Sequence, residues 1–346
     1  MNRLIRVLVV DDSAFVRKVV TQMLSRSPFI EVVGTARNGQ DALEQVERLQ
    51  PNVVTLDLVM PVMDGVTFLR EQMKRRPVAV IVCSITHETG AAALEALEAG
   101  AVDFVQKPTA LATDRIFEIG DELVAKVKAA ASVTLAPVAP VPAEPVVSKR
   151  TEAAGTHRFD IVVIGISTGG PQALRDLIPR LPKTFPVPIA IVLHMPIGYT
   201  LMYAKRLDEV SALEVVEAGE GDPVRPGMVF IAPAGRHLVL TRSSTGEPMT
   251  HLAMQPSDTP HRPAVDVLFR SAADVFGSRV LGIVMTGMGN DGLLGSAHIK
   301  ALGGTIVTEA ESSCVVYGMP RAVVEANLSD LSAPLAGMAA AIMERV

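Results

Sequence analysis

The stretch Asp160-Ile-Val-Val-Ile-Gly165-Ile-Ser167-Thr-Gly-Gly170-Pro171 joins an apolar run, a glycine-rich turn and a proline, in that order. The apolar run is typical of a buried strand, and proline suits the first position of a helix. In a strand–turn–helix unit of an open α/β sheet, the turn lies at the carboxyl edge of the sheet, where ligands bind. Ser167 is therefore expected at a binding or catalytic position.

The same alternation of strands and helices continues from Asp160 to the end of the sequence. We expect strands at residues 161–164, 189–194, 213–216, 229–231, 280–286 and 305–308, and helices at residues 171–180, 200–210, 263–276, 293–301 and 334–345. Segments 237–241 and 250–254 flank a turn rich in Gly, Ser and Pro, which predicts an antiparallel hairpin. Residues 159–346 should therefore form a doubly wound, Rossmann-like, mainly parallel sheet with one antiparallel hairpin.

The first half of the chain carries a separate α/β pattern. Apolar runs at residues 6–10, 31–35, 53–58, 78–83 and 102–105 alternate with helix-length segments, which predicts a flavodoxin-like domain of five βα units over residues 1–128. Residues 129–158 are rich in Ala, Pro and Val, and their prolines are too closely spaced for a helix or a β-ladder. We expect this segment to be an extended linker between two doubly wound domains.

The overall composition is that of a globular protein. The chain has 346 residues, of which 49% are hydrophobic and 20% charged, and its formal net charge is −5. This charge gives no general attraction to nucleic acid or to an anionic membrane, and the first apolar run is too short for a signal peptide or a membrane span. The two cysteines, Cys83 and Cys314, lie far apart, as in a reduced chain. We therefore expect a cytoplasmic protein without nucleic-acid partners or direct membrane insertion.

Charged and polar residues lie at the ends of the predicted strands of the first half. They are Asp11, Asp12, Asp57, Ser84 and Lys107. Converging carboxylates repel one another unless a cation joins them, and oxygen ligands of this kind suit Mg²⁺. Asp57 can then accept a phosphoryl group, while Ser84 and Lys107 bind phosphoryl oxygens. Taken singly, each residue also fits a helix cap, a turn or a solvated loop charge.

The order of these residues, an acidic pair, Asp, Ser and Lys-Pro, resembles the receiver domain of two-component response regulators over nearly the full first half. The resemblance implies that Asp57 accepts phosphate from a histidine kinase, and that Asp11, Asp12 and Asp57 bind Mg²⁺. Phe104 matches the aromatic switch position of that family. A strand aromatic without that role fits Phe104 equally well.

The glycine-rich turn around Ser167 supports three interpretations. A dinucleotide-binding loop needs glycine where Ser167 stands and an acidic residue after the next strand, where His194 stands, so we expect no bound cofactor in this half. A G-x-S-x-G nucleophile elbow of an α/β-hydrolase fits the serine, but its usual chain order is Ser, acid, His. Here the best histidine, His194, precedes the best acid, Asp291.

The third interpretation is a serine hydrolase on a different doubly wound sheet. Ser167, His194 and Asp291 each lie at or just past the end of a predicted strand, so one sheet edge can hold all three. His194 would take the proton of Ser167, and Asp291 would fix the imidazole tautomer. The glycine-rich turns after Ser167 and before Asp291 would present backbone N–H groups to an oxyanion. Each residue also fits a structural role: a turn hydrogen bond, a half-buried histidine, and a cap of the following helix for Asp291.

Several short motifs of the second half resemble those of the chemotaxis protein-glutamate methylesterase family. They are Gly165-Ile-Ser-Thr-Gly-Gly170, His194-Met-Pro196, Ile231-Ala-Pro-Ala-Gly-Arg-His237, His261-Arg-Pro-Ala-Val-Asp266, Thr286-Gly-Met-Gly-Asn-Asp-Gly292 and Tyr317-Gly-Met-Pro320. Together with the receiver and the linker, these motifs reproduce the whole architecture of that family.

The resemblance implies an esterase that phosphorylation activates. Ser167, His194 and Asp291 would form its catalytic triad. The backbone N–H groups of Met288 and Thr168 would be the oxyanion donors, and the esterase would use no cofactor. Its substrates would be glutamyl methyl esters, and specific glutamines, on the cytoplasmic helices of methyl-accepting chemoreceptors. A competing hypothesis is a non-enzymatic signalling module in which Ser167 contacts a phosphate.

Overall fold

The structure of the chain, a computed structural model, describes residues 4–84, 90–107, 113–132 and 158–346. The chain divides into two compact units between residues 138 and 139. Most of the predicted linker, residues 129–158, lies outside the described residues, and the domain boundaries at 128 and 159 remain predictions. None of the helices in the described ranges is long and apolar enough to cross a membrane.

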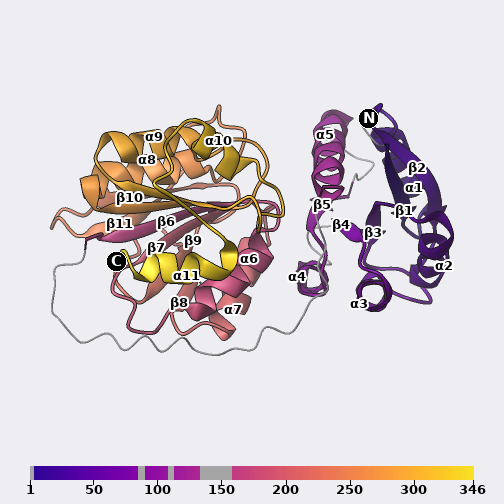
Figure 1. Cartoon of the computed structure of the whole chain (residues 1–346), viewed down its shortest axis with the longest axis horizontal. Coiled ribbons are helices and arrows are strands. Elements are labelled where there is room, and N and C mark those ends of the chain that lie inside the picture. Colours follow the sequence, from indigo (N-terminus) through magenta and orange to yellow (C-terminus); the bar gives the residue numbers. More distant parts are fainter. Residues whose placement is uncertain (1–3, 85–89, 108–112, 133–157) are drawn as a thin grey trace. The chain divides into compact units, whose positions relative to one another are not determined.

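Five parallel strands form the sheet of the first unit, in the order β2-β1-β3-β4-β5 (Figure 1). The elements in chain order are β1 (Ile5–Val10), α1 (Ala14–Leu24), β2 (Ile30–Ala36), α2 (Gly39–Leu49), β3 (Val53–Asp57), α3 (Gly65–Arg75), β4 (Ala79–Ser84), α4 (Gly90–Glu98), β5 (Asp103–Gln106) and α5 (Thr113–Ala130). All five predicted strands are confirmed, each to within one residue at either end. The strand order reverses between β1 and β3, and the carboxyl ends of strands at such a point are where open α/β sheets bind ligands.

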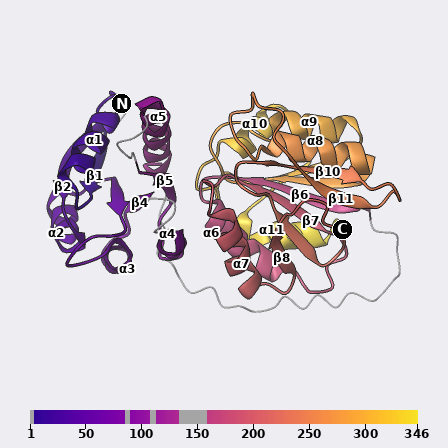
Figure 2. The ribbon, with the colours of Figure 1, turned by 180° about the vertical axis from the view of Figure 1, so that it is seen from behind.

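Seven parallel strands form the sheet of the second unit, in the order β14-β13-β12-β6-β7-β9-β8. The strands are β6 (Ile161–Ile166), β7 (Ile189–Leu193), β8 (Glu214–Glu217), β9 (Met228–Ile231), β12 (Val280–Val284), β13 (Thr305–Glu309) and β14 (Leu331–Ala333). The helices are α6 (Gly170–Leu177), α7 (Thr200–Glu209), α8 (Val265–Phe276), α9 (Leu293–Ala301), α10 (Met319–Glu325) and α11 (Leu335–Met343), with 3-10 turns at Ile178–Arg180 and Gly277–Arg279. Figures 1 and 2 show α8, α9 and α10 on one face of the sheet and α6, α7 and α11 on the other.

The order of the second sheet reverses between β6 and β12. The next strands in the sequence, β7, β8 and β9, lie on one side of β6, and the later strands β12, β13 and β14 lie on the other side. Helices cover both faces, which explains why every residue of β6, β7 and β12 is buried. Ser167 directly follows β6, and Asp291 lies in the loop after β12. Both residues therefore lie at the reversal point, where this kind of sheet binds its ligands.

The second unit differs from the prediction in several details. The strand expected at residues 280–286 ends at Val284, and the last turn of the helix expected at residues 171–180 is a 3-10 helix. The hairpin of β10 (His237–Arg242) and β11 (Pro248–Ala253) forms a separate two-stranded sheet, not an addition to the parallel sheet. Helices α8 and α11 begin one or two residues after the prolines that were expected to open them. Helix α10 and strand β14 were not predicted.

Candidate functional site

Ser167 and His194 follow the ends of two paired strands. Ile166 of β6 is the register partner of Leu193 of β7, and the next residues along these strands are Ser167 and His194. The His194 N–H donates to the Ile166 carbonyl at 3.1 Å. On the other side of β6, the Ser167 N–H donates to the carbonyl of Thr286, past the end of β12, at 2.9 Å. Three neighbouring strand ends therefore meet at Ser167.

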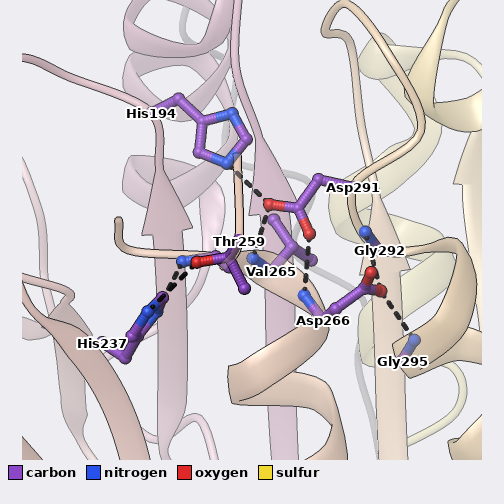
Figure 3. Close-up of polar contacts among 9 residues, drawn as sticks. His194, His237, Thr259, Val265, Asp266, Asp291, Gly292 and Gly295 are labelled. Carbon is purple, nitrogen blue, oxygen red and sulfur yellow. Dashed lines mark hydrogen bonds and ion pairs between the residues drawn. The ribbon is translucent and has the colours of Figure 1, made fainter. Parts of the chain in front are cut away.

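The imidazole of His194 is held through one nitrogen by Asp291 (Figure 3). Nε2 lies 2.9 Å from Asp291 Oδ2, and the two side chains are only 9% and 11% exposed. The other nitrogen, Nδ1, is buried and has no hydrogen-bond partner among the described residues, Ser167 included. The ring also stacks on His261, with 4.1 Å between the ring centroids. Because the Asp291 carboxylate accepts the Nε2–H, Nδ1 carries the lone pair and is the basic nitrogen.

The carboxylate of Asp291 also lies at the start of helix α8 (Figure 3). Oδ2 accepts from the Val265 N–H at 2.8 Å, and Oδ1 accepts from the Asp266 N–H at 2.9 Å. Burial alone would raise the pKa of Asp291, but the contact with His194 and the two backbone N–H groups outweigh it, so this pKa is lowered and the acid stays ionised. The alternative in which Asp291 caps the helix that follows it is wrong, because its oxygens serve α8 and not α9.

Asp266 makes the reciprocal contact with α9. Its Oδ1 accepts from the Gly292 N–H at 3.0 Å and from the Gly295 N–H at 2.7 Å (Figure 3). Burial raises the pKa of Asp266, and the neighbouring charge of Asp291 adds to this effect. The sequence shows Asp266 only as the last residue of a motif. An acid in the first turn of a helix can be noticed in a sequence, but it is ordinarily interpreted as stabilising the start of its own helix.

Thr286, in the loop after β12, forms hydrogen bonds both to the serine turn, which contains Ser167 and Thr168, and to the loop after β13. Its carbonyl accepts the Ser167 N–H, and its Oγ1 donates to the Thr168 carbonyl at 2.9 Å and accepts from the Val316 N–H at 2.9 Å. The Thr286 N–H donates to Oε2 of Glu309 at 2.9 Å. Glu309 is fully buried, and burial raises its pKa. Sequence reasoning missed Glu309, although it directly follows a predicted strand, as the selected residues do.

The backbone N–H groups of Thr168 and Met288 are the predicted oxyanion donors. Thr168 is buried and Met288 is half-buried. Within the described ranges, neither N–H donates a hydrogen bond to another residue, whereas the N–H of Gly287 donates to the Val316 carbonyl at 3.0 Å. The Thr168 N–H, in the serine turn, and the Met288 N–H, in the loop after β12, thus have no acceptor among the described residues, as an oxyanion donor requires.

Two glycines allow the backbone to approach closely at this site. A Cβ on Gly287 would lie 2.4 Å from Met319 Sδ and 2.8 Å from Ser167 Cβ. A Cβ on Gly165 would lie 2.2 Å from Cγ1 of Val265. Glycine therefore lets the turn after β12 press against the serine, and lets the first residue of α8 lie over β6.

His237 has a structural role. It is fully buried, its Nδ1 accepts from the Ala264 N–H at 3.1 Å, and its Nε2 contacts the Pro256 carbonyl at 3.0 Å and Thr259 Oγ1 at 3.3 Å (Figure 3). Burial lowers the pKa of His237, which agrees with a neutral ring that accepts at Nδ1. His237 thereby holds the segment that leads into α8. This also positions the N–H groups of Val265 and Asp266, which donate hydrogen bonds to Asp291.

The first unit gathers its predicted carboxylates at the ends of β1 and β3. Asp11, Asp12 and Asp57 each place an oxygen within 4.8 Å of the others. Lys107 bridges two of them, with Nζ 2.9 Å from Asp11 Oδ2 and 2.7 Å from Asp57 Oδ2. Burial raises the pKa of Asp57 against the opposing effect of Lys107. Three carboxylates and retained waters form the donor set that Mg²⁺ prefers, so the residues present fit this ion.

The remaining predicted residues of the first unit lie at β4 and β5. Ser84 ends β4, beside Gln106 in the register, and its side chain lies outside the described residues. Phe104 is buried, and the ammonium of Lys126 lies 5.8 Å from its ring centroid. The switch role of Phe104 stays a prediction.

Comparisons with known proteins cover both halves of the chain. Residues 162–342 match the CheB methylesterase family, and residues 7–118 match the response regulator receiver domain. The protein-glutamate methylesterase/protein-glutamine glutaminase 5 of Myxococcus xanthus is 53% identical over 99% of this chain and 98% of its own length, and a Symbiobacterium thermophilum protein named as a methylesterase/glutaminase is 47% identical over 100% and 98%. The crystal structure of the Thermotoga maritima CheB methylesterase catalytic domain matches with a TM-score of 0.53 and 42% identity, covering 54% of this chain and 99% of that one. The chain therefore belongs to the CheB methylesterase family and carries a response regulator receiver domain in its first half.

Proposed function

We propose that this chain hydrolyses glutamyl methyl esters on chemoreceptors, and deamidates specific glutamines there, under the control of phosphorylation. The observation that carries the hydrolysis is the contact of His194 with Asp291 at the strand end beside Ser167. Serine hydrolases use these three residue types for acyl transfer. Relatives named protein-glutamate methylesterase/protein-glutamine glutaminase, at up to 53% identity, support the substrate class.

Ser167 is the nucleophile in this proposal. Its Oγ attacks the ester carbonyl while Nδ1 of His194 takes the hydroxyl proton. The imidazolium then protonates the departing methoxide, and methanol leaves. Water attacks the acyl-enzyme by the same route and releases a glutamate side chain. With a glutamine substrate, the leaving group is ammonia.

Asp291 and two backbone groups stabilise the charges that form. Asp291 keeps the proton on Nε2 of His194 and stabilises the imidazolium, and its lowered pKa keeps it a carboxylate. The N–H groups of Thr168 and Met288 receive the tetrahedral oxyanion. The reaction uses no cofactor, because the proton transfer and the oxyanion are both served by the chain itself.

The receiver supplies the control. An oxygen of Asp57 attacks the phosphorus atom of a phosphohistidine on a histidine kinase, the P–N bond breaks, and the kinase histidine leaves as the phosphoryl group passes to the aspartate. Asp11, Asp12 and Asp57 would hold Mg²⁺, which would supply positive charge to offset that of the phosphoryl oxygens. Ser84 and Lys107 bind phosphoryl oxygens. Phosphorylation of Asp57 raises the esterase rate. The partners are thus a kinase and the cytoplasmic helices of methyl-accepting chemoreceptors, which places the chain in the cytoplasm.

Methanol release from methylated receptor, with and without acetyl phosphate, tests the proposal. Ser167→Ala should abolish methanol release and leave phosphorylation intact, while Asp57→Asn should remove the stimulation by acetyl phosphate. A fluorophosphonate should label Ser167 of the unaltered chain. If Ser167→Ala keeps most of the activity, Ser167 is not the nucleophile. Absence of labelling, together with tight nucleotide binding, would instead favour a non-enzymatic signalling module.

A further inference from the structure

Asp266 and Asp291 are joined through the first turns of two helices. Asp291 lies just before α9, yet its carboxylate accepts N–H groups at the start of α8. Asp266 lies in the first turn of α8, yet its carboxylate accepts N–H groups at the start of α9 (Figure 3). The first N–H groups of a helix have no partner within the helix and carry partial positive charge. The start of α8 is thus capped by the acid that precedes α9, and the start of α9 is capped by an acid of α8.

These reciprocal hydrogen bonds fix the backbone of the loop that carries Asp291. Gly292 directly follows Asp291, and its N–H donates to Asp266 Oδ1 at 3.0 Å, as does the N–H of Gly295 at 2.7 Å. One of the two N–H donors to Asp291 belongs to Asp266 itself. The two residues therefore hold each other in place, and a shift of either moves the carboxylate that contacts the imidazole.

The exchange has an electrostatic cost. It brings two carboxylates together in a site that is partly closed to water, and like charges at short range repel. A helix start can be capped as well by Ser, Thr or Asn, without a second negative charge. What distinguishes position 266 is therefore not its charge but the place of its two donors, Gly292 and Gly295, which follow Asp291 in the same loop and first turn.

We propose that Asp266 is a positioning residue for Asp291. By holding the loop that carries Asp291, it keeps that carboxylate in line with Nε2 of His194, and so keeps the ring proton on Nε2. This inference rests on the proposed function, because it gives Asp291 its part in hydrolysis. A displacement of about 1 Å in such a set of residues costs about 10²-fold in rate.

Three variants test the role of Asp266. Asp266→Ala should lower kcat for methanol release by about 10²-fold with little change in KM, because the contacts with the substrate are unaltered. Asp266→Asn should restore most of kcat, because both N–H bonds end on Oδ1 and an amide oxygen can accept them. Asp208→Ala is the matched control, since Asp208 Oδ1 accepts the Val215 N–H at 2.8 Å near the amino end of β8. This control should lose stability in urea but keep its kcat.

The outcomes separate this inference from the function on which it rests. If the unaltered chain releases no methanol, the proposed function fails. If the unaltered chain is active and Asp266→Ala keeps full kcat, only the role of Asp266 is overturned. Equal losses in Asp266→Ala and Asp266→Asn also overturn it, because the amide keeps the hydrogen bonds and removes only the charge. If Asp266→Ala does not fold, Asp266→Ser takes its place, with an oxygen that serves as a cap and a smaller expected loss.

Discussion

Asp291→Asn changes the hydrogen bonds of the candidate acid without changing the shape of the side chain. The carboxylate accepts the Nε2–H of His194 and the N–H groups of Val265 and Asp266. An amide has only one oxygen. If that oxygen takes the Oδ2 position, the NH₂ group faces the Asp266 N–H. If it takes the Oδ1 position, the NH₂ group faces Val265 and Nε2, the ring proton moves to Nδ1, and His194 can no longer accept a proton from Ser167.

The size of the effect follows from these contacts. Either orientation leaves one backbone N–H of α8 opposed by another donor, which costs about 1–3 kcal/mol of stability. Either orientation also removes the negative charge opposite the imidazolium. The same exchange in a Ser-His-Asp triad lowers kcat by about 10⁴-fold. That factor corresponds to about 5.5 kcal/mol of transition-state stabilisation, at about 1.36 kcal/mol per tenfold.

The assay is methanol release at saturating methylated receptor, with urea unfolding measured on the same preparations. Asp291→Asn should unfold at lower urea concentration and lose about 10⁴-fold in kcat with little change in KM. Asp208→Asn, which alters a carboxylate remote from the site, serves as the control and should keep its kcat. If Asp291→Asn keeps kcat within about tenfold of the unaltered chain while showing the expected loss of stability, Asp291 is not the partner of the catalytic base.

Three further predictions concern other parts of the two sites. Gly287→Ala should lower kcat by about 10²-fold, because the added Cβ would displace the turn that packs against Ser167. Gly337→Ala in α11, whose added Cβ would make only ordinary contacts with Pro334 at 3.8 and 3.9 Å, should leave kcat unchanged; equal activities of the two variants would contradict this. Burial raises the pKa of the Glu309 carboxyl in the folded chain above its ordinary value of 4.5. The folded chain therefore binds this proton more tightly than the unfolded chain does. The resulting stabilisation is full below pH 4.5 and is lost as the pH rises through the raised pKa. Glu309→Gln should therefore flatten this part of the stability curve in urea unfolding, and an unchanged slope would count against it. Asp12→Asn should weaken Mg²⁺ binding in calorimetry without loss of stability, because Asp12 is exposed; unchanged affinity would remove Asp12 from the site.

The central strands of both sheets can be predicted because both of their faces are buried. Each residue of Ile161–Ile166 and of Ile189–Leu193 is buried, so each strand appears as an unbroken apolar run. Strand β14 has three residues, of which one is buried, and helix α10 has seven residues with a proline in its first turn. Segments this short show no period that separates them from loops, which explains why they were missed.

The candidate site is predictable where it depends on strand ends and unpredictable where it depends on helix packing. Ser167 and His194 follow strands that are neighbours in both sequence and sheet. Asp291 could be selected as an acid after a strand, but its partner helix could not, because local capping rules assign such an acid to the next helix. The exchange of caps between α8 and α9 is set by how these helices pack, and no pattern in either segment alone contains that information.

The orientation of the His194 ring decides which isomer an alkylating inhibitor would form. In the familiar serine-protease arrangement, the acid holds Nδ1, and Nε2 faces the serine. In this chain Asp291 holds Nε2, and Nδ1 is the buried nitrogen without a partner among the described residues. On the proposed mechanism, in which Nδ1 takes the proton of Ser167, a substrate-like chloromethyl ketone would alkylate the ring at Nδ1 and yield the π-substituted histidine. Reagents developed against proteases, whose warheads are placed to reach Nε2, would present their electrophile to the wrong side of this ring.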